Sequence, residues 1–375
     1  MRIASYNVEN LFDRAKVLAS AEWSDARELL DAYTELTKVL QQQDYSAVDK
    51  TMILRLLDKL GLKAADETAL FRLRQNRGRL VRRAADGTVT VVANGRGDWI
   101  GWLEMKRATV SDLAVRHTAQ VVHDVGADVL GVVEAEDRWA LRHFNADQLA
   151  PLGGRIYGHI MLIDGNDERG IDVGLLTRGS LPIGSITSHV DDADLAGPIF
   201  SRDCPEFELA LPGGRTLVVM VNHFKSKGYG GRESTVRRKR QAQRVREIYE
   251  QRRADGFDLV AIVGDLNDHP ESDALSPLLR SGGTGVASKP SDLQDVSAFP
   301  GFDDLGRPGT FGTAGKAFKI DYILCSPALF ATITAAGVHR AGVWTASGKW
   351  PMYPTLKRKQ DAASDHAAIW ADLAL

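Results

Sequence analysis

Seven short apolar runs carry polar residues at one end, and this feature constrains the fold of the 375-residue chain more than any other. Apolar runs of about four to eight residues are typical of buried strands. In four runs the polar residues follow the strand, and in three they lie at or near its start. These runs are residues 2–6, 128–133, 217–221 and 259–263, then residues 171–176, 321–324 and 365–370.

The position of these polar residues predicts how the strands run. Residues at the ends of some strands and at the starts of others share one sheet edge only if those strands are antiparallel to each other. We therefore expect an α/β protein with mixed or antiparallel sheets, and not an all-parallel sheet. The chain also lacks a Gly-x-Gly-x-x-Gly turn after a strand, which agrees with this expectation.

The run at residues 259–263 ends in the most informative motif, Gly264-Asp265-Leu266-Asn267. The carboxylate of Asp265 and the amide of Asn267 stand two positions apart. Such a pair can polarise and orient a water molecule, because the carboxylate accepts its proton and the amide fixes its direction. Taken alone, Gly-Asp after a strand is usually a simple turn. The motif gains weight only from the other strand ends.

Helices are expected between the strands, and one long block interrupts them. Residues 110–125, 234–253 and 272–280 have helical patterns, the last with Ser272 as a candidate cap. We interpret residues 1–375 as a single domain that contains an insertion at residues 19–105. Within the insertion, helices are expected at residues 25–42, 46–60 and 66–76, and Asp86-Gly87 is expected to turn a hairpin at residues 79–92.

Composition narrows the class of protein only moderately. The net charge of −2 does not favour coating by nucleic acid over the whole surface, although local patches can still bind it. No apolar run approaches the roughly 20 residues that span a bilayer, and no apolar signal segment opens the chain. We expect a cytoplasmic protein without a membrane anchor or an obligate protein partner. Cys204 and Cys325 lack metal-ligand spacing, so both are expected to be reduced.

Taken together, the strand-end motifs resemble the endonuclease/exonuclease/phosphatase superfamily, which includes pancreatic deoxyribonuclease and the apurinic endonucleases. The resemblance is strongest to its bacterial nuclease-like branch. It implies a four-layer αββα sandwich with the active site at one edge of two packed sheets. The matching segments are Ser5–Asn10, Val133–Glu136, Arg169–Val173, Asn222–Lys227, Gly264–Asn267, Ile320–Tyr322 and Ser364–His366.

The resemblance implies a divalent cation, Mg²⁺ or Mn²⁺, bound by oxygen ligands. Glu134 is the first expected ligand, and Asn7 and Asp365 complete the set. Glu136 would face the same side of an extended strand as Glu134, so it is the alternative ligand at this position.

The resemblance also implies catalytic roles. Asp265 and Asn267 activate and orient the attacking water, or bind a second cation. His366 contacts the scissile phosphate, and Asp321 behind it fixes the tautomer and raises the basicity of the imidazole. His223 is either a second phosphate contact or the acid that protonates the leaving oxygen. Asp172 resembles the carboxylate that pairs with His223.

Substrate contacts are expected from basic residues near these motifs. Arg169, Lys225, Lys227 and Arg232 are the candidate phosphate or nucleic-acid ligands. Three basic clusters suit a polyanion: residues 237–246, residues 72–83 and residues 357–359. Four tryptophans could stack on unpaired bases, namely Trp99, Trp102, Trp344 and Trp350. Basic helices are commonly solvated, however, and tryptophans are more often core residues.

The sequence thus predicts a divalent-metal-dependent phosphodiester hydrolase and favours a nuclease that cleaves DNA or RNA. The alternative is a phosphatase or phosphodiesterase that acts on a small molecule or a lipid headgroup. A non-catalytic nucleic-acid-binding module is disfavoured because every expected carboxylate and both histidines are present. The choice between DNA and RNA, between endo and exo cleavage, and between one and two metal ions stays open.

Overall fold

The structure is a computed structural model that describes residues 1–19, 23–153, 156–167, 170–227, 231–279 and 291–375. The chain divides into two compact units. The first comprises Met1–Phe12, Val110–Lys227 and Gly231–Leu375, and the second comprises Asp13–Thr109. Each unit has its own hydrophobic core, so each is described separately.

The first sheet of the first unit has six strands in the order β19-β20-β1-β8-β10-β9. They are β1 (Arg2–Asn7), β8 (Val129–Ala135), β9 (His159–Ile163), β10 (Asp172–Thr177), β19 (Ile333–His339) and β20 (Ala368–Leu373). The central pair, β1 and β8, is parallel, and every other neighbouring pair is antiparallel. The expected mixed sheet is therefore confirmed.

The second sheet repeats this plan in the order β11-β14-β15-β16-β18-β17. Its strands are β11 (Ile183–Thr187), β14 (Glu206–Ala210), β15 (Thr216–His223), β16 (Leu259–Asp265), β17 (Gln294–Asp295) and β18 (Asp321–Cys325). Its central pair, β15 and β16, is parallel, and its other pairs are antiparallel. A small ribbon, β12 (Ala193–Asp194) with β13 (Gly197–Pro198), lies outside both sheets.

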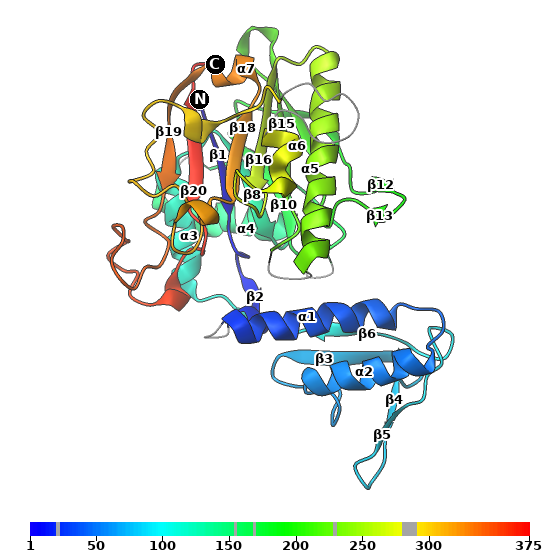
Figure 1. The fold of residues 1–375 in the computed structure, drawn as a ribbon. Helices are drawn as coiled ribbons and strands as arrows, with labels where there is room; N and C mark the ends of the chain where they lie inside the picture. Colours follow the sequence, from blue (N-terminus) through cyan, green and yellow to red (C-terminus); the bar gives the residue numbers. More distant parts are fainter. Residues whose placement is uncertain (20–22, 154–155, 168–169, 228–230, 280–290) are drawn as a thin grey trace. The chain divides into compact units, whose positions relative to one another are not determined.

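The two sheets pack face to face and helices cover their outer faces (Figure 1). Val133 of the first sheet and Val221 and Ile323 of the second belong to the apolar layer between the sheets. The outer face of the first sheet packs on α3 (Asp112–Val125) and α4 (Arg138–His143). The outer face of the second packs on α5 (Gly231–Ala254) and α6 (Ser276–Leu279). The unit is a four-layer αββα sandwich, as the resemblance implied.

Local sequence explains where the covering helices begin and end. Ser111 caps α3 by accepting the N–H of Ala114, and Gly126 ends the helix with a φ of 60°, in the left-handed region that favours glycine. The predicted cap Ser272 is confirmed, because its Oγ accepts the N–H of Leu275 at the start of a short 3-10 turn before α6. A further short helix, α7 (Pro327–Phe330), begins with proline at its first turn.

The second unit combines two helices with three small antiparallel sheets. Its elements are β2 (Asp13–Ala15), α1 (Trp23–Leu40), α2 (Ala47–Lys59), β3 (Phe71–Arg77), β4 (Val81–Arg83), β5 (Val89–Val91), β6 (Ile100–Met105) and β7 (Arg107–Thr109). A capping box of Ser46 and Asp49 starts α2 at the predicted break. The strands β4 and β5 confirm the predicted hairpin. The assignment of this unit as an insertion within one domain stays a prediction.

Two expected elements were wrong in type or position. Residues 66–76 are not a helix, because Phe71 and Leu73 alternate with outward-facing arginines and form strand β3 against β6. The strand expected at residues 365–370 begins only at Ala368. The preceding backbone N–H groups of Asp365 and His366 donate instead to the side chains of Glu9 and Ser364.

Among the described residues, no helix is both long enough and apolar enough to cross a membrane.

Candidate active site

Strand register brings three predicted residues into one row across the second sheet. His223 at the end of β15 lies level with Asp265 at the end of β16, because these strands are parallel. Asp265 in turn lies opposite Asp321 at the start of the antiparallel strand β18. The expected convergence of strand ends and strand starts at one edge is therefore observed.

Gly264 permits this register. Its φ is 133°, and an added Cβ would lie 1.9 Å from the carbonyl oxygen of Asn222 on β15. Only glycine allows the two backbones to approach so closely in this conformation. The glycine before Asp265 therefore serves the approach of two parallel strands.

The carboxylate of Asp265 lies at the centre of the site and is almost fully buried. Its Oδ1 accepts the backbone N–H of Asn267 at 2.8 Å. Its Oδ2 lies 3.3 Å from Asn7 Nδ2, 3.8 Å from His223 Nε2 and 3.9 Å from His366 Nε2. Residues from both sheets thus surround one oxygen of this carboxylate.

His366 and Asp321 form a buried pair beside Asp265. Nδ1 of His366 lies 2.8 Å from Asp321 Oδ2, so the ring donates from Nδ1 and directs Nε2 toward Asp265. The ring of Phe311 packs on the imidazole with centroids 4.8 Å apart. Burial lowers the pKa of His366, but the charges of Asp321, Asp365 and Asp265 outweigh it and raise that pKa well above 6.5.

A β-bulge aims Glu134 into the site. Asp172 of β10 pairs with Ala135 and Val173 pairs with Val133, so Glu134 is left between them with a φ of 60°. Regular alternation would turn its side chain away from the second sheet, because Val133 already faces that sheet. With the bulge, Oε1 of Glu134 lies 3.4 Å from His223 Nε2.

The alternative ligand Glu136 has a structural role. Its two carboxylate oxygens accept the backbone N–H groups of Leu11 and Phe12, at 3.1 and 2.6 Å. This carboxylate secures the segment that follows β1. Glu134, rather than Glu136, therefore faces His223.

Asn7 and Asp365 are held by an acidic residue that sequence reasoning missed, Glu9. Glu9 accepts the N–H of Asp365 through Oε2 at 3.1 Å, and its own N–H donates to Asn7 Oδ1 at 3.0 Å. Ser364 adds a bond from its Oγ to the carbonyl of Asn7 at 2.8 Å. The sequence offered one signal for Glu9, namely its place in the Asn7-Val8-Glu9-Asn10 motif.

Unusual backbone conformations gather at this site. Among the described residues, six non-glycine residues have a positive φ, and four of them are Glu9, Asn10, Glu134 and Asn267. Such conformations cost free energy and persist only where the surroundings enforce them, often at functional sites. Their concentration at the sheet edge marks it independently of the side-chain chemistry.

The charge of the site fits a divalent cation. Burial raises the pKa of Asp265 well above its ordinary value, and the negative charge of Asp321 raises it further. A bound dication would relieve this crowding, and Asn7, Glu134, Asp265 and Asp365 offer the oxygen ligands that Mg²⁺ and Mn²⁺ prefer. Asp265, Asp321 and His366 also offer ligand atoms within 4.8 Å of one another. However, His366 and Asp321 are already hydrogen-bonded to each other at 2.8 Å, so we do not assign them as cation ligands.

Asp172 lies at the start of β10 and is fully buried. Its Oδ1 accepts the N–H of Gly165 at 2.8 Å. Burial, together with the neighbouring Asp164 and Asp167, raises the pKa of Asp172 to about 7. The closest ion-pair distances of His223 are to Glu134 and Asp265, and its pairing with Asp172 stays a prediction.

Of the four predicted phosphate-contacting residues, the three that the structure describes differ in their exposure and in their ion pairs. Lys225 and Lys227 follow His223 directly, and Lys227 Nζ lies 2.6 Å from Asp268 Oδ1 while its side chain stays 41% exposed. Arg232 is exposed in the first turn of α5. Arg169 lies outside the described residues.

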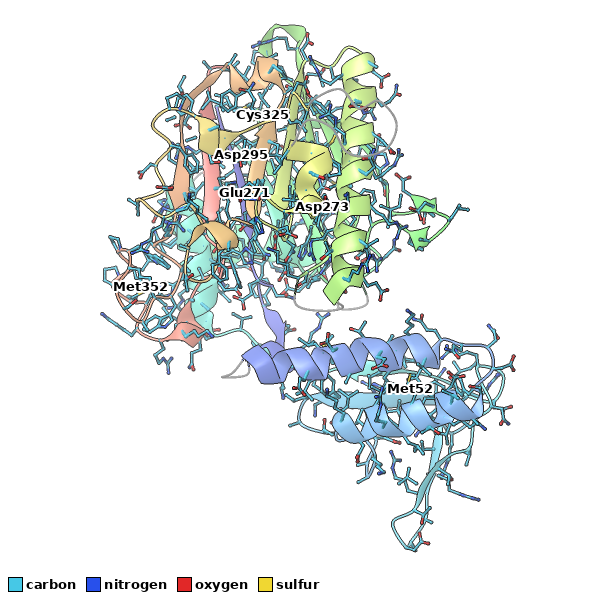
Figure 2. All side chains as sticks on the ribbon, viewed as in Figure 1. Met52, Glu271, Asp273, Asp295, Cys325 and Met352 are labelled. Carbon is cyan, nitrogen blue, oxygen red and sulfur yellow. The ribbon has the colours of Figure 1, made fainter. Side chains whose placement is uncertain are left out.

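The basic clusters are less available than the sequence suggested, because carboxylates, some near and some distant in sequence, pair with many of their residues. On α5, Arg240 binds Asp194 of β12 and Arg244 binds Asp192. Asp273, beside α5 in Figure 2, pairs with Lys239 at 2.8 Å. Further pairs are Arg72–Glu67, Arg74–Glu104, Arg83–Asp66, Arg246–Glu250 and Arg358–Asp361.

Two of the four expected stacking tryptophans are core residues. Trp99 is completely buried in the second unit. Trp350 is 5% exposed, and its Nε1 donates to the carbonyl of Val343. Trp102 is 52% exposed and keeps a surface suitable for stacking. Stacking by Trp99 and Trp350 is therefore excluded by their burial.

Three of the solved structures that are similar to this chain are compared by identity, coverage and TM-score. Truncated Caenorhabditis elegans TDP2 is 17% identical, with 69% of this chain and 90% of that one covered and a TM-score of 0.45. For Bacteroides thetaiotaomicron mannosyl-6-phosphatase the values are 18%, 70%, 92% and 0.48. For the human Nocturnin catalytic domain with bound sulfate they are 14%, 70%, 86% and 0.46. Likeness at these scores carries no argument about activity.

The sequence of the chain matches a protein-family model. Among curated proteins, no sequence matches this chain significantly. The model of the Endonuclease/Exonuclease/phosphatase family matches residues 94–340, which is more than half of the chain and includes Glu134, His223, Asp265 and Asp321. The chain belongs to the Endonuclease/Exonuclease/phosphatase family and is a hydrolytic phosphoesterase.

Proposed function

We propose that this protein is a divalent-metal-dependent phosphodiesterase that cleaves DNA or RNA by in-line attack of water. The observation that carries the chemistry is the convergence of Asn7, His223 and His366 on one oxygen of Asp265. Asp265 is the proton acceptor for the attacking water, because the N–H of Asn267 and the amide of Asn7 fix its carboxylate at the centre of the site. Asn267, fixed beside it, orients that water.

His366 stabilises the negative charge of the phosphoryl group. Its raised pKa keeps the imidazole protonated near neutral pH, so that Nε2 can donate to a phosphate oxygen. Asp321 holds the ring by its bond to Nδ1 and favours the charged form. This pair supplies a fixed positive charge in a buried site, where electrostatic stabilisation is strong.

His223 protonates the leaving oxygen. His223 and Asp321 lie on opposite sides of Asp265, on the two strands that flank β16, and His223 lies beside Glu134. An alkoxide leaving group needs a proton as the bond to phosphorus breaks, and an imidazole is well suited to supply it. Oε1 of Glu134 lies 3.4 Å from Nε2 of His223 and holds the ring in place.

The oxygens of Asn7, Glu134, Asp265 and Asp365 would hold a divalent cation. When bound, Mg²⁺ or Mn²⁺ supplies positive charge that polarises the phosphoryl oxygens and neutralises the charge that develops in the transition state. Glu9 keeps Asn7 and Asp365 in place through its two hydrogen bonds.

Nucleic acid as the substrate is supported by cations that follow His223 in the sequence. Lys227 keeps part of its side chain in solvent, and Arg232 is exposed. Phosphate groups that flank the scissile bond would bind these cations and release counterions. A polymer with several phosphates uses such neighbouring cations better than a single ester does.

A small phosphate ester is the second candidate, and one observation favours it. The arginines of α5 are largely paired with carboxylates such as Asp192, Asp194 and Glu250, which reduces the positive surface available to a polyanion. In this case the same catalytic groups act on a substrate that needs only the central site.

A hydrolysis panel distinguishes these candidates. Purified protein is incubated with supercoiled plasmid, single-stranded DNA, RNA, bis-p-nitrophenyl phosphate and inositol phosphates, in Mg²⁺, Mn²⁺ or EDTA. Asp265→Ala and His366→Ala are the controls. Metal-dependent cleavage of polynucleotide, absent in both variants, supports the nuclease. Turnover of only the small esters contradicts it and supports the second candidate.

A further inference from the structure

The segment that follows His223 leaves the second sheet, yet side chains hold its backbone. Phe224 donates its N–H to the carbonyl of Asp265 at 2.9 Å. The N–H of Lys225 donates to Gln241 Oε1 at 2.9 Å, and its carbonyl accepts Arg238 Nη1 at 3.1 Å. One backbone bond to β16 and two side-chain bonds therefore fix this segment relative to the strand ends of the site.

The carbonyl of Phe224 is part of a closed set of hydrogen bonds around Asp265. It accepts Nδ2 of Asn267 at 3.1 Å, and the N–H of Asn267 donates to Asp265 Oδ1 at 2.8 Å. Because Nδ2 is directed to this carbonyl, the acceptor atom Oδ1 lies on the other arm of the planar amide. The orientation of the Phe224 carbonyl thus determines whether Oδ1 or Nδ2 of Asn267 points toward the proposed position of the attacking water.

Arg202 is the second donor to that carbonyl. Its Nη1 lies 3.3 Å from the Phe224 oxygen, and its Nε lies 2.8 Å from Asp167 Oδ2. The Arg202 side chain is only 1% exposed. A buried guanidinium is costly to desolvate and is a weak source of stability, so its position calls for another explanation. It connects the loop containing Asp167 to the peptide that orients Asn267.

We propose that Arg202 is a positioning residue that fixes the orientation of the Asn267 side-chain amide through the shared carbonyl of Phe224. The inference rests on the proposed function, in which Asn267 orients the attacking water. A carbonyl oxygen has two lone pairs, and donors on both hold the peptide plane against rotation. Without Arg202 the plane can tilt, and the amide of Asn267, whose backbone has a strained φ of 54°, loses its fixed direction.

The matched control is another buried arginine at the opposite end of a sheet. Arg178 follows β10, is 8% exposed, and donates from Nε to the carbonyl of Ala127 at 3.0 Å. Ala127 precedes β8, whereas Glu134 lies near the other end of that strand. Arg178→Met removes a comparable buried bond to a backbone carbonyl and leaves the catalytic edge intact.

The test is a double-mutant cycle with steady-state kinetics on whichever ester of the panel the wild type hydrolyses. Arg202→Met is expected to lower kcat about 10- to 100-fold with KM within about twofold, because small displacements of a positioned group are costly. Arg178→Met should keep both constants within about twofold. In an Asn267→Ala background, Arg202→Met should change kcat by less than about twofold, because the residue through which it acts is gone.

An equal loss of kcat in the wild-type and the Asn267→Ala backgrounds would overturn the proposal. Arg202→Lys keeps a charge opposite Asp167 but loses the forked donor geometry, so it replaces Arg202→Met if that variant does not fold. Crystal structures of either variant provide a readout that needs no activity. We expect the Asn267 amide to be rotated. An unchanged Asn267 with Nδ2 still bonded to Phe224 would refute Arg202's role. Failure of the wild type to hydrolyse any ester would refute the proposed function alone.

Discussion

The substitution Asp321→Asn tests the charge pair behind the phosphate-binding histidine. Asparagine keeps the shape of the side chain but removes its negative charge. Asp321 is the nearest of the carboxylates that raise the pKa of His366, while burial of the ring lowers that pKa. The variant should therefore lower the pKa of His366 and leave more of the imidazole neutral at pH 7.

The size of the effect follows from the geometry. The bond between His366 Nδ1 and Asp321 Oδ2 is 2.8 Å long and almost fully buried. Buried hydrogen bonds to charged groups contribute about 1.5–3 kcal/mol net. If the whole of this contribution acts in the transition state, kcat falls about 10- to 150-fold at pH 7.

The assay is the pH dependence of kcat. A histidine with a raised pKa stays protonated through neutral pH and loses its proton only as the pH rises through that raised value. The alkaline limb of the wild type should thus lie well above pH 6.5, and Asp321→Asn should move it to lower pH. Asp295→Asn is the control, because Asp295 is a partly buried carboxylate on the neighbouring strand, paired with Lys319 at 2.6 Å. An unchanged kcat and alkaline limb in Asp321→Asn would refute the reasoning.

Four further predictions test other parts of the molecule. His223→Gln should slow hydrolysis of an alkyl phosphodiester about 10²-fold or more but affect a p-nitrophenyl ester much less, because p-nitrophenolate leaves without a proton; equal losses on both esters would exclude an acid role. Gly264→Ala should destabilise the protein by about 3 kcal/mol or more in urea denaturation, since its Cβ would lie 1.9 Å from the Asn222 carbonyl; unchanged stability would contradict this. His189 lies 2.9 and 3.0 Å from two carboxylates, which raise its pKa against the effect of burial. These charge pairs therefore stabilise the fold fully below pH 6.5, and this stabilisation is lost as the pH rises through the raised pKa. His189→Gln should lower Tm more at pH 6 than at pH 9, and the reverse order would be incompatible with the charge pairing. Mg²⁺ should raise the Tm of the wild type more than that of Glu134→Gln, and equal shifts would remove Glu134 from the cation site.

The architecture could be predicted because strand chemistry is local. Short apolar runs such as residues 259–263 are typical of buried strands, and the polar residues at their ends indicated a shared sheet edge. Residues 66–76 failed because the alternation of Phe71 and Leu73 with arginines spans only a few residues and lies beside helical segments. Nothing near Asp365 indicated that side chains would take its backbone N–H and delay the strand.

The site was predictable where residue type and strand end coincide, as for Asp265 and His366. It was not predictable where long-range contacts decide. The bulge that aims Glu134 depends on the register with β10, and the neutralisation of Arg240 depends on Asp194, 46 residues away. Arg202 lies in a loop without a motif, so only the structure connects it to Asn267.

The buried carboxylate of Asp265 is central to the proposed metal-dependent phosphoester hydrolysis, because it accepts the proton of the attacking water. The most direct test is phosphate-ester hydrolysis by protein freed of metal with EDTA and titrated with Mg²⁺, for the wild type and Asp265→Asn side by side. The account predicts activity in the wild type that appears with Mg²⁺ and is lost at least about 10³-fold in the variant. Activity that persists in EDTA, or an Asp265→Asn variant with wild-type turnover, would contradict it.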